Sequence, residues 1–243
     1  MTIKITLAQL NPTVGDINGN AKKITDLWDA SDSDLIIFPE LFLCGYPPED
    51  LSNNAGFISA LNNKITELQN HSKNCSAAAI IPTIWLENEE IYNAALLIEN
   101  GEIAHIFKKH HLPNYSVFDE VRNYKSAPLP EPINFKGHKL GIMICEDMWY
   151  PDLPSHLHEK GAEVLISINA SPYHTTKHER RQTVAQRCIT QTQTPLIYLN
   201  MVGGQDELVF DGRSFILDNK GNTLLDGASF TDEITEVEIN KSN

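Results

Sequence analysis

Short apolar segments of strand length recur along the whole chain, and segments with helical spacing separate many of them. Ile3, Ile5 and Leu7, for example, share one face of a strand expected over residues 3–9. Such alternation predicts an α/β layered fold with a mixed sheet. Further strands are expected over residues 34–40, 77–85, 92–98, 138–145, 163–170, 195–202 and 232–239, and helices over residues 18–30, 54–69 and 152–160.

Local signals mark several boundaries between these elements. Residues 99–103 read as a hairpin turn, and residues 214–227 as a complete hairpin. Thr176 with Glu179 three residues later resembles a capping box that opens a helix to about residue 191. Because no linker, repeat or low-complexity stretch interrupts the pattern, we expect one domain over residues 1–243.

Composition excludes several classes of protein. The formal net charge of −13 argues against a nucleic-acid or anionic-membrane partner, which would favour a basic surface. No apolar run approaches the ~20 residues needed to span a bilayer. The first residues lack the layout of a signal peptide, so a cytoplasmic location is expected.

The cysteines and histidines give no metal-site pattern. The four cysteines (Cys44, Cys75, Cys145, Cys188) are scattered and none belongs to a CxxC pair, so we expect free thiols. His110 and His111 are adjacent, and neighbouring side chains of an extended segment point to opposite faces. His174 and His178 lack the acidic partner of an HExxH site. No metal is predicted.

Three polar residues follow expected strands directly. Glu40 ends "LIIFPE", Lys109 follows "AHIF", and Cys145 ends "GIMIC". Chemistry in open α/β folds collects at the carboxyl ends of strands, so these side chains are expected at one rim. A carboxylate there can act as general base toward a thiol, and an ammonium group can stabilise a thiolate or an oxyanion. The position of Cys145 is also compatible with a structural cysteine that is buried at the end of a strand.

The segments around these residues resemble the nitrilase, or carbon–nitrogen hydrolase, superfamily. They read "FPELFLCGY" around Glu40, "FKKHHLPNY" around Lys109 and "GIMICEDMWYP" around Cys145. The resemblance implies a Glu-Lys-Cys triad, a four-layer α-β-β-α sandwich and a homo-oligomer. Counting back three residues from Leu112 selects Lys109 over Lys108, whose side chain should point the other way.

A finer resemblance covers nearly the whole chain. The segments "GYPPEDL", "LPNYSVFDE", "NASPYHTTKHERR" and above all "GGQDELVFDG" are similar to the glutaminase domains of glutamine-dependent NAD synthetases. The resemblance implies that L-glutamine is hydrolysed through a cysteine thioester and that a synthetase domain, in cis or in trans, uses the ammonia. No SGGxDS or GxxxxGK[ST] loop occurs, so ATP and Mg²⁺ are expected only for that absent domain, and no cofactor for this one.

The same resemblance assigns further roles. Glu120 corresponds to a second glutamate that orients the lysine or the attacking water. Tyr115, Phe118, Glu146 and Ser171 correspond to glutamine-binding positions, with Glu146 reading the substrate ammonium and its backbone N–H serving as an oxyanion donor. Residues 121–124 ("VRNY") depart from the family's "ERYF"-like pattern in a loop that shapes the pocket.

Two other functions stay open on the sequence. The absent synthetase domain is compatible with a stand-alone carbon–nitrogen hydrolase that acts on another small amide. An inactive nitrilase-like module with a regulatory or binding role is the third hypothesis, against which the complete triad argues. Asp147, next to Glu146, has no assigned role at this point.

Overall fold

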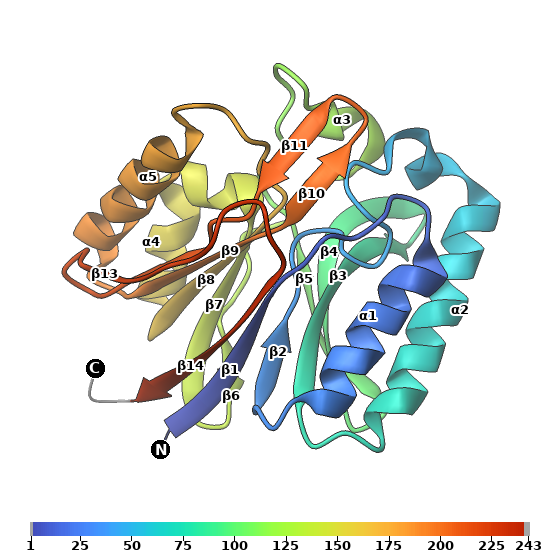
Figure 1. Cartoon of the computed structure of the whole chain (residues 1–243), viewed down its shortest axis with the longest axis horizontal. Helices are drawn as coiled ribbons and strands as arrows, with labels where there is room; N and C mark the ends of the chain where they lie inside the picture. Colours follow the sequence, from blue (N-terminus) through green and yellow to red (C-terminus); the bar gives the residue numbers. More distant parts are fainter. Residues whose placement is uncertain (1, 241–243) are drawn as a thin grey trace.

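The computed structural model describes residues 2–240 and contains two six-stranded sheets packed face to face, with helices on both outer faces (Figure 1). Helices α1 and α2 cover the first sheet, and α4 and α5 cover the second. The predicted four-layer α-β-β-α sandwich is therefore confirmed.

The first sheet has the order β14 (Glu233–Asn240), β1 (Thr2–Gln9), β2 (Leu35–Ile37), β3 (Ala78–Glu87), β4 (Glu90–Glu99), β5 (Glu102–Lys108). The second has the order β13 (Thr223–Asp226), β12 (Phe215–Leu217), β9 (Leu196–Asn200), β8 (Val164–Asn169), β7 (His138–Ile144), β6 (Ile133–Phe135). A separate hairpin joins β10 (Val202–Gln205) to β11 (Leu208–Asp211). The helices are α1 (Ile17–Ala30), α2 (Ala55–Ser72), α3 (Glu120–Asn123), α4 (Asp152–Glu159) and α5 (Lys177–Thr192), with 3₁₀ helices η1 (Glu49–Asn53) and η2 (Cys145–Trp149).

Three apolar layers hold the sandwich together. One lies between the α1/α2 pair and the first sheet, one between the sheets, and one between the second sheet and the α4/α5 pair. Ile3, Ile5 and Leu7 all belong to the layer between the sheets, as their spacing predicted. The period-2 alternation of β1 places Ala8 in the other layer, against the helices.

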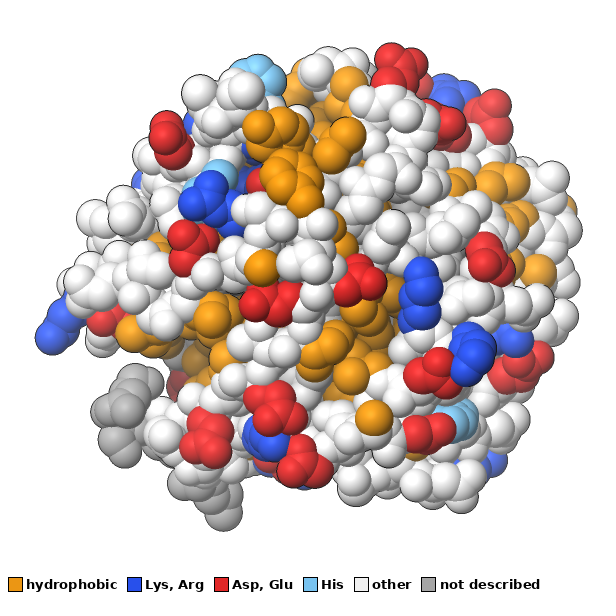
Figure 2. Space-filling model, in the orientation of Figure 1, with side chains coloured by type: hydrophobic (Ala, Val, Ile, Leu, Met, Phe, Trp, Pro, Cys, Tyr) orange, Lys and Arg blue, Asp and Glu red, His pale blue; other side chains and the backbone are white. Residues whose placement is uncertain are grey.

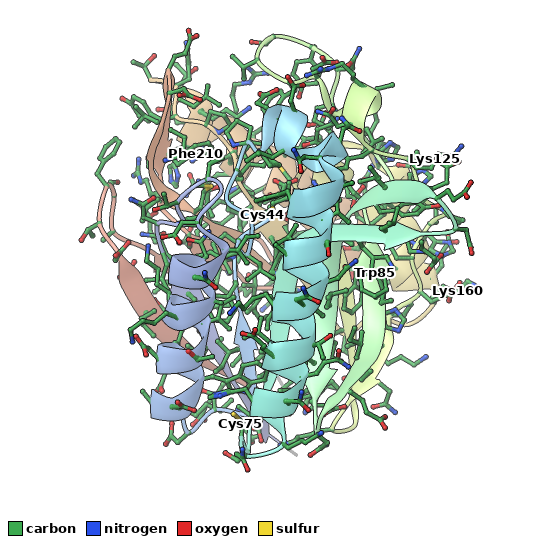
Figure 3. All side chains as sticks on the ribbon, turned by 90° about the vertical axis from the view of Figure 1, so that its right-hand side faces the viewer. Cys44, Cys75, Trp85, Lys125, Lys160 and Phe210 are labelled. Atoms are coloured by element: carbon green, nitrogen blue, oxygen red, sulfur yellow. The ribbon has the colours of Figure 1, made fainter. Side chains whose placement is uncertain are left out.

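The outer helices are amphipathic and capped. Helix α1 buries Ala21, Ile24 and Trp28, and the Asp16 side chain accepts a hydrogen bond from Gly19 N at its start. Figure 3 shows α1 and α2 side by side over the first sheet. Helix α5 begins where expected, but no side-chain hydrogen bond caps it, so the predicted capping box at Thr176 is wrong.

Parallel pairing brings strand ends of both sheets to one end of the molecule. Strands β1, β2 and β3 run parallel, as do β7, β8 and β9. The carboxyl ends of β2, β7 and β8 therefore lead into the loops that carry chemistry. Strand β2 is shorter than expected and ends at Ile37, because the chain turns at residues 39–44 with Phe42 N bonded to Pro39 O.

The β10–β11 hairpin splits the strand expected over residues 195–202 and was not predicted. It contains most of the "GGQDELVFDG" motif. Gly212, next to the hairpin, has φ = 65°, and a Cβ added there would lie only 2.5 Å from the Gln9 side-chain amide, so glycine is required. Val209 in the hairpin is exposed. On the face shown in Figure 2, acidic and basic side chains are interspersed with hydrophobic ones. Within residues 2–240, no helix is long and apolar enough to cross a membrane.

Candidate active site

Glu40 lies in the turn after β2, and its side chain is completely buried. One carboxylate oxygen, Oε1, accepts hydrogen bonds from Lys109 Nζ (2.6 Å) and Asn93 Nδ2 (2.8 Å). The other, Oε2, accepts one from the backbone N–H of Ala170 (3.0 Å), at the end of β8. Both sheets therefore hold this carboxylate, and each oxygen has a donor.

Lys109 follows β5 and is buried between two carboxylates. Its Nζ lies 2.6 Å from Glu40 Oε1 and 2.8 Å from Glu120 Oε2. Burial disfavours the ammonium ion, but Glu120 and Glu40 together raise the pKa of Lys109 well above its usual value, so it stays charged. Lys108 points the other way, as predicted, and pairs with Glu87.

Glu120 begins α3, a short helix absent from the predicted elements. Tyr46 Oη donates to its Oε1 (3.2 Å), and Phe118 and Tyr46 line a small cavity beside it. Burial raises the pKa of Glu120 to about 7, with the Glu40 charge acting in the same direction and Lys109 opposing it. The Glu40–Lys109–Glu120 group is hereafter called the charged cluster. The Tyr46–Glu120 hydrogen bond connects it to the loop that precedes η1.

Cys145 follows β7 directly and begins η2 with φ = 48°, a left-handed conformation uncommon outside glycine. Backbone strain of this kind concentrates at functional sites. Burial raises the pKa of the Cys145 thiol well above its usual value; Glu40 adds to this, and Lys109 lowers it. The resting side chain is therefore a neutral thiol that needs a base before it can attack.

Asp147 has a structural role that its sequence context did not reveal. Its Oδ1 accepts hydrogen bonds from the backbone N–H groups of His110 (3.1 Å) and His111 (2.8 Å), and its Oδ2 accepts from Ile144 N (2.9 Å). Burial raises the pKa of Asp147 to about 6 despite these donors. One carboxylate therefore joins the loop after Lys109 to the turn that carries Cys145.

Glu146 and Tyr115 form a second polar group next to the cysteine. Tyr115 Oη lies 3.1 and 3.0 Å from the two Glu146 carboxylate oxygens, and the Tyr115 ring packs against Phe118 at 5.5 Å. Burial raises the pKa of Glu146, although Tyr115 and the cations Lys109 and Lys177 oppose the shift. The structure thus brings three of the four residues predicted to bind glutamine together.

Lys177, which the sequence analysis did not single out, provides a cation near Cys145 and Glu146. It opens α5, its Nζ lies 4.6 Å from the centre of the Trp149 ring, and burial lowers its pKa. Cys145 and Glu146 both act on it electrostatically in the direction that favours its charge. A partly buried cation near an anion and a thiol is suited to hold a substrate carboxylate.

Ser171 follows β8 and is held by a buried arginine that the sequence reading also missed. Arg181 Nε donates to Ser171 Oγ (3.2 Å), Nη2 to Ser171 O (2.7 Å), and Nη1 to Asp211 Oδ1 (2.8 Å). Arg181 and Asp211 are both buried, so their charges are paired away from water. Asp211 belongs to the "GGQDELVFDG" motif, so this motif was the sequence feature that could have indicated the Arg181–Asp211 pair.

Two groups of residues elsewhere could hold a metal ion: Asp29, His71 and Cys75, and separately His110, His111 and Asp152. The His110 and His111 rings lie 4.4 Å apart, so the expectation that they point to opposite faces is wrong. Its premise fails because β5 ends at Lys108 and the chain bends at His110. Neither group includes a residue of the charged cluster.

Comparison with known proteins gives a consistent result. The model of the carbon–nitrogen hydrolase family matches residues 4–243. The chain is 40% identical over 240 residues to the glutamine-dependent NAD(+) synthetase of Aquifex aeolicus, covering 98% of this chain and 42% of that protein. A structure of glutamine-dependent NAD+ synthetase from Acinetobacter baumannii in complex with ADP matches with a TM-score of 0.92 and 31% identity, covering 100% of this chain and 46% of that one.

A nitrilase-superfamily amidase of Nesterenkonia shares the fold, with a TM-score of 0.82 at 20% identity, over 99% of this chain and 91% of that one. The chain therefore spans less than half the length of the NAD synthetases but nearly the whole of this amidase. With the family model covering almost every residue, the chain belongs to the carbon–nitrogen hydrolase family.

Proposed function

We propose that this chain hydrolyses the side-chain amide of L-glutamine to glutamate and ammonia through a thioester at Cys145. The observation that carries the proposal is the charged cluster, in which Lys109 contacts both Glu40 and Glu120 while all three act electrostatically on the Cys145 thiol. Similarity to glutamine-dependent NAD synthetases supports glutamine as the substrate.

Acylation uses two residues of the charged cluster, Glu40 and Lys109. Glu40 takes the thiol proton of Cys145 as Sγ attacks the amide carbonyl carbon of glutamine. The oxyanion of the tetrahedral intermediate is stabilised by Lys109 Nζ and by the backbone N–H of Glu146, in the first turn of η2. Glu40 then returns the proton to the departing nitrogen as the C–N bond breaks, which releases ammonia and leaves a glutamyl thioester.

Deacylation repeats these steps with water. Glu40 removes a proton from a water molecule that attacks the thioester carbonyl, and the C–S bond breaks. Cys145 leaves as a thiol after taking back a proton, and glutamate departs. Glu120 takes no proton in this scheme; it holds the Lys109 ammonium in position with Glu40.

Recognition of glutamine matches the charges around Cys145. The Glu146 carboxylate, oriented by Tyr115, pairs with the α-ammonium group, and Lys177 pairs with the α-carboxylate. Ser171 and Phe118 shape the two ends of the pocket between them. An amide that lacks one of the two α-substituents would leave Glu146 or Lys177 without its partner, which costs binding energy.

The destination of the ammonia is a synthetase unit, in cis or in trans, that amidates deamido-NAD with ATP and Mg²⁺. The similarity to NAD synthetases that are more than twice as long supports this part of the proposal. A homo-oligomer and a cytoplasmic location also belong to the proposal.

The decisive experiment measures ammonia release from L-glutamine by the wild type and by Cys145→Ala. We expect a loss of at least about 10⁴-fold in kcat for the variant. A diazoketone analogue of glutamine should react covalently with the wild type and raise its intact mass by that of one bound analogue. The mass of Cys145→Ala should not change. Supplying a glutamine-dependent synthetase unit that lacks its own glutaminase activity guards against a slow isolated chain.

The competing functions predict different results in the same assays. If a panel of small amides contains one that is hydrolysed much faster than glutamine, the chain is a carbon–nitrogen hydrolase of other specificity. If no amide turns over and no adduct forms at Cys145 even with the synthetase unit present, the chain is an inactive module.

A further inference from the structure

Directly after Lys109 in the chain, His110 and His111 form a second polar group near the surface together with Asp152. His111 Nε2 lies 2.9 Å from Asp152 Oδ1, and His110 Nε2 lies 3.9 Å from Asp152 Oδ2. One ligand atom from each residue lies within 4.8 Å of the others. All three are separate from the residues that contact Glu40, so the proposed hydrolysis makes no use of them.

Both histidines are held in place by contacts other than those with Asp152. His110 Nδ1 is bonded to the carbonyl oxygen of Ala127, which can only accept, so Nδ1 carries the proton and Nε2 keeps its lone pair. The His111 ring stacks on Tyr150 at 4.1 Å, and Asp147 holds the backbone N–H groups of both histidines. A ring nitrogen oriented by a backbone carbonyl on its other side is the usual arrangement of a metal-binding histidine.

We propose that His110 Nε2, His111 Nε2 and the Asp152 carboxylate bind one Zn²⁺ ion. Two imidazoles and a carboxylate suit zinc, and three protein ligands leave the fourth tetrahedral position to water. Zn²⁺ replaces the proton that His111 Nε2 shares with Asp152, and that ring then carries its proton on Nδ1. The Asp152 side chain is about half exposed (48%), so it can move to the shorter ligand distances of a zinc site.

The ion would join two parts of the active-site support. His110 and His111 belong to the loop after β5, and Asp152 is the first residue of α4. Asp147 lies between these parts and already accepts from both histidine backbones. Zinc therefore adds a second connection between the lysine loop and the segment after Cys145, and it should stabilise the fold without contacting the substrate.

The other group, Asp29, His71 and Cys75, supplies a matched control. Cys75 lies at the opposite end of the molecule from the hairpin residue Phe210, as Figure 3 shows. His71 Nε2 is bonded to Asp29 Oδ1 (2.8 Å), but no backbone acceptor orients its other ring nitrogen in the described structure. We therefore expect this group to contribute little to zinc affinity.

The test uses the full chain carrying Cys145→Ser, so that the catalytic thiol cannot bind the ion. Titration with ZnCl₂ by calorimetry should show one ion per chain, and Co²⁺ should give the visible absorption of a tetrahedral site. Asp152→Asn and His111→Gln should each weaken zinc binding at least tenfold. At free Zn²⁺ about 100 times the wild-type Kd, the melting temperature should rise by about 5–10 °C, and at the same free Zn²⁺ this rise should fall to about half or less in both variants.

Asp29→Asn, at the control group, should leave the stoichiometry, affinity and melting shift unchanged. Circular dichroism of each variant without metal shows whether it is folded. Zinc binding that survives in folded Asp152→Asn and His111→Gln, or that is lost in Asp29→Asn, overturns the proposal. Absence of saturable binding by the Cys145→Ser chain overturns it as well.

Discussion

The two halves of the sandwich contribute different chemistry to one site. The half built on the first sheet contributes the charged cluster, whose groups are buried and contact one another directly. The half built on the second sheet contributes Cys145, with a strained backbone, and Ser171, held by a paired arginine. In the proposed mechanism, the first half therefore handles protons and the oxyanion, whereas the second attacks and positions the substrate.

The halves also differ in how they balance charge. The charged cluster has two carboxylates for one ammonium ion, so it carries excess negative charge in a buried place. Arg181 and Asp211 balance one to one. A buried pair that is already balanced fixes geometry, whereas an unbalanced cluster keeps a carboxylate available as a base.

Lys109→Met tests the first half with the largest expected effect. Removing the ammonium leaves two buried carboxylates without a cation and the oxyanion without its charge partner. We expect kcat to fall by at least about 10³-fold and unfolding free energy to drop by about 3–5 kcal/mol. Adding Glu120→Gln should restore part of the stability, measured by urea denaturation, but not the activity. A Lys109→Met variant that loses stability but stays active would show that the cluster is only structural.

Glu146→Gln tests recognition in the second half. Losing a charged partner for the substrate ammonium should raise KM for glutamine about 10- to 100-fold with a much smaller change in kcat, in line with ~1.5–3 kcal/mol for such a bond. Tyr115→Phe keeps the carboxylate and removes only its hydroxyl partner, so it should have a smaller effect. Equal falls in kcat for both variants would place Glu146 in the chemistry instead.

Asp147→Asn tests the connection between the halves. An amide can accept through one oxygen only, so its NH₂ group would face a backbone N–H that the carboxylate now satisfies. We expect a loss of about 2 kcal/mol in unfolding free energy. The exposed Asp26→Asn should change stability by less than about 0.5 kcal/mol. Equal stability of the two variants would remove Asp147 from this role.

The pH dependence of kcat/KM gives the smallest expected effect. An acid is protonated below its pKa and ionised above it, and ionised Glu120, with a pKa of about 7, holds Lys109. Activity should therefore rise about tenfold from pH 6 to pH 8. In Glu120→Gln this step should disappear from the profile. A step that persists unchanged in that variant belongs to another group.

Much of this architecture could be predicted because strands and helices show their period in the sequence. Glu40, Lys109 and Cys145 were found because each follows an apolar run directly, and parallel strands bring such ends together. Glu120 was found only through the family resemblance. Periodicity cannot reveal partners distant in sequence, such as Asn93 and Ala170 around Glu40, which come from different sheets. Such contacts depend on how the layers are stacked.

Other errors have local physical causes. The capping box at Thr176 matched a sequence pattern, but the helix begins without the side-chain hydrogen bond. The β10–β11 hairpin was missed because both strands have only four residues and β10 contains two glycines, which leaves little alternation to detect. Arg181 was not singled out from the sequence, because a buried cation can be recognised only once its acceptors Asp211 and Ser171 are known.

The three hydrogen bonds of Asp147 also bear on thermal motion. The lysine loop and the cysteine turn share one rigid acceptor, so small displacements of one should carry the other along. Correlated motion of this kind leaves the separation of Lys109 and Cys145 nearly constant while each atom fluctuates. The precision of the site would then depend on relative motion between these two segments, which is smaller than the mobility of either segment suggests.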